Sequence, residues 1–184
     1  MKEIIKFTLP LVIICIISAI ALACTFAIAR PIIESNQLEE IRQSLEKVMP
    51  YADSFEQIGE NLELDGVIIE TVFKARQSGK TIGLAAIVAT PGYQDMIKFM
   101  IGFEIQKAAG IVSFRISDIK ILELLETPGV GSRVGEEDFL AQFRSRNPGQ
   151  DFDTITGATI SSSAMIHAVK EASLKLMEDY YDLS

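Results

Sequence analysis

Hydrophobic and polar positions divide the chain into an apolar beginning and a longer remainder with periodic patterns. Residues 7–29 contain no charged side chain. As a helix that rises about 1.5 Å per residue they would reach about 34 Å, enough to cross a hydrocarbon core of about 30 Å. The pattern predicts an N-terminal membrane anchor over residues 1–30, with a transmembrane helix at 7–29, and one globular domain over residues 31–184.

Charges on either side of the apolar segment predict its orientation. Lys2 and Lys6 precede it, whereas Arg30 is soon followed by acidic residues. This distribution favours a cytoplasmic N-terminus, because basic residues tend to stay on the cytoplasmic side. We therefore expect a single-pass protein of the cell (inner) membrane with its domain on the extracytoplasmic side.

Two processing signals are alternatives to an uncleaved anchor. Residues 21–23 and 27–29 both follow the A-x-A pattern of a signal-peptidase site, and a lipoprotein signal could end at Cys24. The apolar run is longer than the hydrophobic region of most signal peptides, so the anchor is preferred.

The domain begins with a helical pattern and continues with strands. Leu38, Ile41, Leu45 and Val48 share one helical face, and Pro50 ends this amphipathic segment. Residues 51–66 are polar and are interpreted as a connection. Alternating positions and short turns then predict four strands, at residues 67–74, 81–89, 96–104 and 111–122.

Helical segments complete the pattern. A short helix is expected within residues 135–146, and a last helix over residues 161–180 carries the apolar stripe Met165, Val169, Ala172, Leu176 and Tyr180. Strands joined by short turns form mainly antiparallel sheets. The fold class predicted is α+β, a mainly antiparallel sheet with helices on one side, preceded by one transmembrane helix.

Composition then limits the chemistry of the domain. Both cysteines, Cys15 and Cys24, fall within the apolar segment, and the chain has a single histidine, His167, read as a structural or surface residue. Disulfides, thiol chemistry and a zinc site are therefore not expected in the domain. Residues 31–184 hold 14 basic and 24 acidic side chains, a net charge of −10, which argues against nucleic acid or anionic lipid as partners.

One short stretch suggests the chemistry that remains. "DTITGATISS", residues 153–162, ends where the last helix begins, so that Gly157, Ala158 and Thr159 lie at the helix N-terminus and Ser161 to Ser163 are possible caps. Free amides and the positive end of the helix dipole favour a phosphate there. A nucleotide P-loop, G-x-x-x-x-G-K-[ST], is absent from the chain.

The pattern Asp153-x-x-Thr156-Gly157-Ala158-Thr159 resembles the flavinylation motif of the FMN-binding domain family. That family includes the G subunit of the Rnf complex and the C subunit of the sodium-pumping NADH:quinone reductase. The resemblance extends over nearly the whole chain and includes "ETPGVG" at residues 126–131 ahead of "FLAQF". Gln94 and Asp95 stand where the family often has glycines.

The resemblance implies a covalent cofactor and a site. FMN would be attached through a phosphoester to Thr159 by a flavin transferase, and the 126–131 loop would lie beside the flavin ring, which Tyr93 could also face. The site residues implied are Asp153, Thr156, Gly157, Ala158, Thr159, Ile160 and Ser161 together with Glu126, Thr127, Gly129, Val130 and Gly131. A turn with Pro128 and two glycines would bring the backbone close to a flat ring.

The function implied is electron transfer through this FMN within an Rnf-type ferredoxin:NAD⁺ oxidoreductase that translocates ions. The chain would be an electron carrier beside other membrane subunits, without its own substrate turnover, which agrees with the lack of a catalytic His, Cys or carboxylate cluster. Two alternatives stay open. The chain could belong to another extracytoplasmic reductase of the sodium-pumping type, or it could be a flavin-free, membrane-anchored assembly module.

Overall fold

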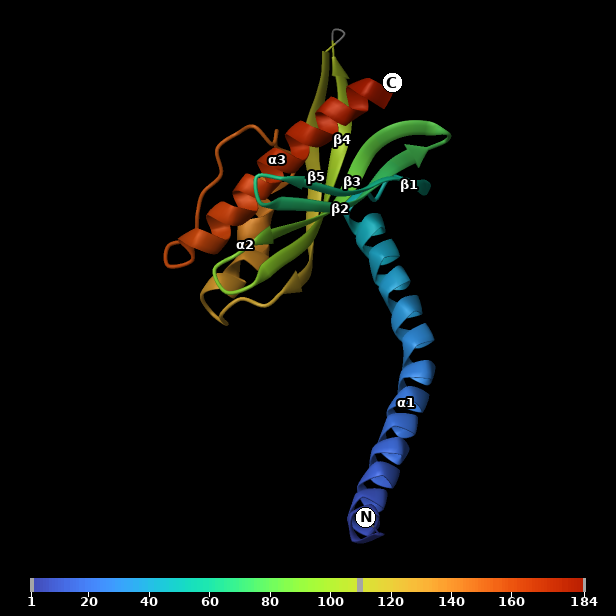
Figure 1. Cartoon of the computed structure of the whole chain (residues 1–184). Helices are drawn as coiled ribbons and strands as arrows, with labels where there is room; N and C mark the ends of the chain where they lie inside the picture. Colours follow the sequence, from blue (N-terminus) through green and yellow to red (C-terminus); the bar gives the residue numbers. More distant parts are fainter. Residues whose placement is uncertain (1, 109–110, 184) are drawn as a thin grey trace. The chain divides into compact units, whose positions relative to one another are not determined.

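The computed structural model describes residues 2–108 and 111–183 (Figure 1). Two compact units are present, Met1–Arg42 and Gln43–Ser184. Helix α1 (Lys2–Val48) contains all the described residues of the first unit and, with its last residues, the beginning of the second.

The first unit is helical throughout the residues described. Sequence patterns predict two helices separated near Pro31, but α1 is continuous and has Pro10 and Pro31 in its interior. Proline removes one backbone donor and its fixed φ still fits a helix, so long helical segments on both sides can outweigh the interruption. Of the helices described, α1 is the one that is long and apolar enough to cross a membrane. It therefore indicates membrane association.

A single five-stranded sheet forms the centre of the second unit. Strands β1 (Ser54–Leu64), β2 (Val67–Gln77), β3 (Lys80–Pro91), β4 (Met96–Ala108) and β5 (Ile111–Leu124) follow one another in space as in sequence. Each neighbouring pair is antiparallel. The four strands predicted from alternation are confirmed, and so is the α+β class.

The interpretation of residues 51–66 as a polar connection is wrong, because most of them form the edge strand β1. Its apolar residues Ile58, Leu62 and Leu64 pack at the margin of the core. A register shift between Gln57 and Gly59 and the positive φ of Asn61 (56°) interrupt the alternation that would have revealed a strand. Bulges and acidic side chains are common on edge strands, where they discourage pairing with other chains.

Helices cover one face of the sheet. The chain passes from β5 through η1 (Gly131–Gly135), α2 (Glu137–Leu140) and η2 (Ala141–Phe143) to the long helix α3 (Thr159–Leu183). The predicted stripe of α3 is buried at Met165, Val169, Ala172 and Leu176, and it joins one core with Phe99, Ile101 and Phe103 of β4. The side chain of Tyr180 lies outside the described residues. This packing holds α3 against the sheet.

The end of α1 covers the opposite face of the sheet. The sequence predicted helices on one side only, so this second layer was not expected. Leu45, Val48 and Met49 are buried there. Gly102 lies beneath this helix end, and a Cβ atom at that position would be 2.5 Å from the Val48 carbonyl oxygen. The glycine therefore permits a close approach of helix to sheet.

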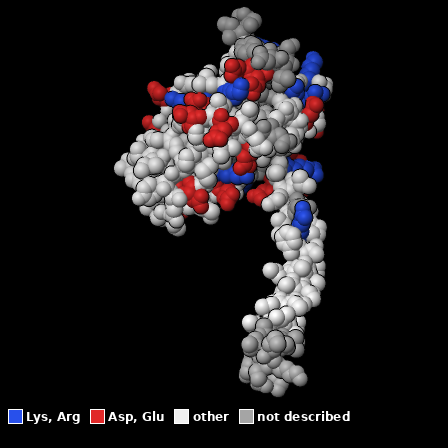
Figure 2. All heavy atoms as spheres, in the orientation of Figure 1, with Lys and Arg blue, Asp and Glu red and all other residues white. Residues whose placement is uncertain are grey.

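Charged side chains are concentrated on the second unit. Figure 2 shows acidic groups spread over the face in view, whereas the described apolar part of α1 is bare of charge. The distribution follows the sequence, whose acidic excess lies after residue 30. It is the pattern expected for a water-exposed domain on an apolar anchor.

Candidate functional site

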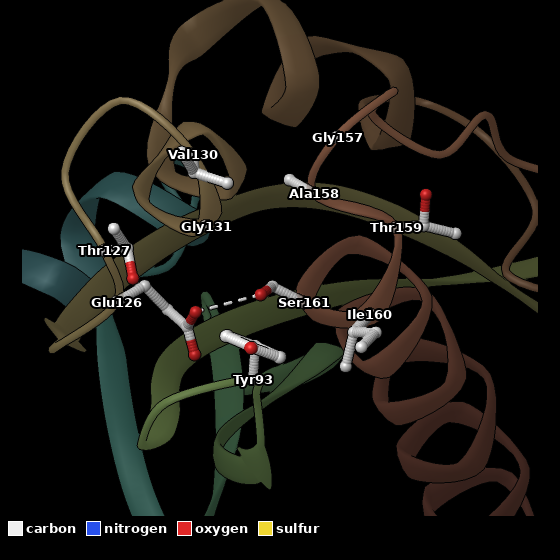
Figure 3. A pocket seen from close by; sticks show the side chains of 10 residues that line it. All are labelled: Tyr93, Glu126, Thr127, Val130, Gly131, Gly157, Ala158, Thr159, Ile160 and Ser161. Atoms are coloured by element: carbon white, nitrogen blue, oxygen red, sulfur yellow. Dashed lines mark hydrogen bonds between the residues drawn. The ribbon is translucent and has the colours of Figure 1, made fainter.

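A hollow lies where the loop after β5 meets the beginning of α3 (Figure 3). Its volume is about 480 Å³, within the range of small-molecule sites. The loop forms one wall, the start of α3 forms the other, and Tyr93 from the β3–β4 turn lies between them. The lining consists of Tyr93, Glu126, Thr127, Val130, Gly131, Gly157, Ala158, Thr159, Ile160 and Ser161.

The first wall is the compact turn at residues 126–131. Thr127 O accepts hydrogen bonds from the amides of Val130 and Ser132, both at 3.2 Å. The Gly129 amide donates to Ser132 Oγ at 2.9 Å, and Gly129 has a φ of 72°, which disfavours any side chain. The turn thereby presents Thr127, Val130 and the Gly131 backbone to the hollow.

The second wall is the N-terminus of α3. Gly157 adopts a φ of 86° and reverses the chain, after which the buried Ala158 precedes Thr159, the first residue of the helix. Ser162 N donates to Ala158 O at 3.0 Å and begins the helical hydrogen bonds. In the part of the chain that the structure describes, no acceptor faces the amides of Thr159, Ile160 and Ser161. Three free donors therefore accompany the Thr159 hydroxyl.

A buried carboxylate joins the two walls. Glu126 Oε2 accepts a hydrogen bond from Ser161 Oγ at 3.0 Å, the contact drawn in Figure 3, and Oε1 accepts from the Gln94 amide at 3.1 Å. Ser161 is thus a partner of Glu126, and its side chain is not the helix cap that the sequence allowed. The Oγ of Ser162 accepts from the Ile155 amide at 3.1 Å, so it binds the preceding loop rather than a free amide of the helix.

The structure brings nine of the twelve predicted site residues to this hollow. Gly129 shapes the first wall without lining it. Asp153 and Thr156 line a second, more open hollow of about 380 Å³, together with Arg133 and Gln142. The reversal at Gly157 is the reason, since it turns the earlier half of the motif away from the later half. His167 also lies apart, with its Nε2 3.4 Å from Asp65 Oδ2.

Gln94 has a role in the site that the sequence did not predict. Its amide donates to Glu126, and its side-chain Oε1 accepts from Thr127 Oγ1 at 2.9 Å. The glutamine that stands here in place of the family's glycine thus connects the β3–β4 turn to the first wall by hydrogen bonds. The tripeptide "TPG" occurs in both of the turns that meet here, at residues 90–92 and 127–129. This repeat was the sequence signal that could have pointed to the contact between the two turns.

The side chains and free amides around the hollow suit a flat aromatic ligand that carries a phosphate. Tyr93, Val130 and Ile160 are respectively 70%, 46% and 58% exposed around the hollow. Apolar side chains of this kind cover ring faces, and free amides at a helix N-terminus bind phosphate. The residues present therefore fit FMN.

Comparison with known proteins supports this fit. Residues 92–173 match the model described as FMN-binding domain. That segment contains both walls of the hollow, and this part of the chain is similar to the FMN-binding domain family, as the motif predicted.

Similarity to named relatives extends over most of the chain. It is 28% identical over 182 residues to the G subunit of the ion-translocating oxidoreductase complex of Methanosarcina acetivorans, covering 93% of each chain. It is 24% identical to the G subunit of the proton-translocating ferredoxin:NAD(+) oxidoreductase complex of Clostridium ljungdahlii, covering 93% of this chain and 90% of that one. Among solved structures, Shewanella oneidensis NqrC is similar at a TM-score of 0.46 and 19% identity, covering 67% of this chain and 66% of that one.

Proposed function

We propose that the chain is the electron-transfer subunit of an Rnf-type, ion-translocating oxidoreductase, and that it carries FMN as a phosphoester on Thr159. The observation on which this rests is the exposed Thr159 in the lining of the hollow, together with the three unpaired amides of Thr159, Ile160 and Ser161. The match to the FMN-binding domain and the names of the relatives support the same conclusion.

Attachment would proceed at a hydroxyl that is accessible to another protein. Thr159 is exposed, so a flavin transferase can reach it. In the transfer from FAD, the pyrophosphate bond breaks, an Oγ–P bond forms, AMP leaves and the hydroxyl proton is released. The free amides of α3 would then hold the phosphate charge, because they lie at the positive end of the helix dipole.

The remaining residues orient the cofactor. Tyr93, Val130 and Ile160 would cover the ring, and the turn at residues 126–131 would approach its edge with backbone groups. Bound FMN supplies the redox chemistry of the site. The protein supplies a covalent tether, an orientation and an electrostatic environment, and it needs no general acid or base of its own.

The anchor would keep this domain on the extracytoplasmic side of the membrane, with other membrane subunits of the complex as partners. Lys2 and Lys6 before the apolar segment support that orientation. A covalent bond is useful on that side, where a dissociated cofactor would be lost. Protease added to intact spheroplasts should digest the domain, and protection of the domain would contradict the orientation.

The attachment is tested by coexpression of the full chain with a flavin transferase. The purified protein should show a fluorescent band on a denaturing gel and an intact mass increased by one FMN phosphoester. Thr159→Ala should abolish both signals and Thr159→Ser should retain them, because serine keeps the hydroxyl. Thr154→Ala is the matched control, since this exposed threonine lies outside the hollow.

Each result separates the alternatives. Label on Thr159→Ala would overturn the attachment residue, and unlabelled wild-type protein would favour the flavin-free assembly module. Labelled protein that copurifies with a different reductase would support the FMN attachment but would contradict the assignment to an Rnf-type complex. Purification from native membranes, followed by identification of the accompanying subunits, makes that distinction.

A further inference from the structure

Glu126 is a buried acidic residue in the wall of the hollow. Only 6% of its surface is exposed, although the preceding residue, Leu125, is 55% exposed. Burying a carboxylate is costly unless its oxygens have partners. The hydrogen-bond partners of Glu126 therefore indicate its role in the hollow.

Three separate segments meet at this carboxylate. Oε1 accepts from the Gln94 amide of the β3–β4 turn, and Oε2 accepts from Ser161 Oγ in the first turn of α3. Glu126 itself belongs to the turn at residues 126–131, and its neighbour Thr127 donates a further hydrogen bond to the Gln94 side chain. One side chain thus connects every segment that lines the hollow.

Two glycines leave the space that the carboxylate occupies. A Cβ atom at Gly92 would collide with Oε1, and one at Gly131 would collide with Oε2. Neither glycine has a positive φ, so steric space rather than backbone conformation explains both of them. The backbone is closely fitted around the two oxygens of Glu126.

The negative charge of this group has no cationic partner in the described chain. Among the described residues, no Lys, Arg or His forms an ion pair with Glu126. Its compensation comes from the two hydrogen bonds and from the N-terminal end of α3. A charge in this position acts on the interior of the hollow with less screening than a surface charge.

We propose that Glu126 is the positioning residue of the flavin site: it fixes the spacing of the three segments and places a negative charge in the wall that lowers the redox potential of bound FMN. The inference rests on the proposed function. Reduction adds electrons to the ring, and a nearby fixed negative charge opposes that addition. Removing the charge should therefore raise the midpoint potential.

The experiment compares three variants of the full chain, matured with flavin transferase in detergent. Glu126→Gln keeps the side-chain length and the acceptor for Gln94 but removes the charge. Glu126→Ala removes both the charge and the connection. Glu123→Gln is the control, because it removes the same charge from an exposed residue of β5.

Spectroelectrochemical titration, fluorescence anisotropy and amide exchange form the readouts. Relative to wild type and Glu123→Gln, the midpoint potential should shift to a more positive value in Glu126→Gln. Glu126→Ala should show the same shift and also a lower flavin anisotropy, because the walls are no longer connected. In unflavinylated protein, the Gln94 amide should exchange on the order of fivefold faster in Glu126→Ala, the effect of one lost hydrogen bond.

Failure of this inference is distinct from failure of the proposed function. A potential in Glu126→Gln equal to that of wild type would overturn the electrostatic role, and an unchanged Gln94 exchange rate in Glu126→Ala would overturn the positioning role. Absence of flavin from correctly matured wild-type protein would instead overturn the proposed function. The exchange measurement needs no flavin, so it tests the positioning role in either case.

Discussion

Ser162 Oγ accepts a hydrogen bond from the Ile155 amide at 3.1 Å and donates one to the Ala158 carbonyl at 2.8 Å. A single buried hydroxyl thereby closes the loop that contains Thr156 and Gly157 onto the first turn of α3. Thr159, the first residue of α3, directly follows this closed segment. The sequence allowed Ser161 to Ser163 as helix caps, but Ser162 instead connects the helix to the loop that precedes it.

Replacement of Ser162 by alanine should destabilise the domain by about 1–3 kcal/mol, because the Ile155 amide loses its acceptor in a partly buried place. Chemical unfolding of the detergent-solubilised chain, followed by circular dichroism, measures this change. Ser163→Ala is the matched control, since Ser163 is exposed on the same turn, and it should change the free energy of unfolding by less than about 0.5 kcal/mol. Equal stabilities for the two variants would contradict the role of Ser162 in closing this loop.

Gln142 pairs with the backbone of Asp153 as a neighbouring strand would. Its Nε2 donates to Asp153 O at 3.1 Å, and its Oε1 accepts from Asp153 N at 2.7 Å. Gln142→Ala should leave the global fold intact and loosen residues 153–156, giving local amide exchange on the order of tenfold faster. Mass spectrometry after hydrogen exchange checks this. If flavinylation needs an ordered motif, the initial rate of FMN attachment should fall in the same variant.

An exposed glutamine in the same region provides the control for that prediction. Gln150 precedes the motif without pairing to Asp153, so Gln150→Ala should change neither local exchange nor the attachment rate. Slower attachment in Gln142→Ala with unchanged exchange would assign Gln142 to direct recognition by the transferase. Unchanged exchange and an unchanged rate would show that the two hydrogen bonds do not order the motif.

The backbone at Gly157 has a conformation that side chains disfavour. Its φ is 86°, and a Cβ atom there would have no heavy atom within 4 Å. Gly157→Ala should therefore cost about 1–2 kcal/mol through backbone strain alone. Gly157→Asn should cost less, because asparagine tolerates this conformation better. Thermal unfolding of the two variants compares them, and a larger loss for asparagine would indicate a steric role instead.

Strong local patterns were sufficient to predict much of the fold. Alternation in residues 67–122 predicted four strands, and the stripe from Met165 to Leu176 predicted the buried face of α3. Edge strand β1 was missed because its register shift and the positive φ of Asn61 disturb the period of two. A strand of this kind is recognised by the partner that it pairs with, and pairing is not visible in local sequence.

The candidate site was predictable as two separate pieces. Local glycines and a resemblance to a family pointed to the turns at residues 126–131 and 157–161. The hydrogen bond between Glu126 and Ser161 connects residues 35 positions apart, and no local pattern predicts such a contact. The separation of Asp153 from Thr159 was also hidden, because it results from the direction of the chain after Gly157.

Arg144 connects α2 to the sheet through two carboxylates. Its Nε lies 2.7 Å from Asp118 Oδ1 of β5, and its Nη1 contacts Glu137 Oε1. The hydrogen bond from Arg144 holds the pKa of the Glu137 carboxyl below its ordinary value of 4.5. A carboxyl whose pKa is lower in the folded protein contributes stability at higher pH and loses it on protonation.

The stabilising contribution of Glu137 should be complete above pH 4.5, its ordinary pKa, and should disappear as the pH falls through the lower folded value. Melting temperatures of wild type and Glu137→Gln, measured between neutral and acidic pH, should therefore converge in acid. Glu136→Gln removes the adjacent exposed charge. Its melting temperature should differ from that of wild type by a smaller amount, and this difference should depend less on pH. A constant difference between wild type and Glu137→Gln across this range would show that the ion pair with Arg144 does not contribute to folding stability.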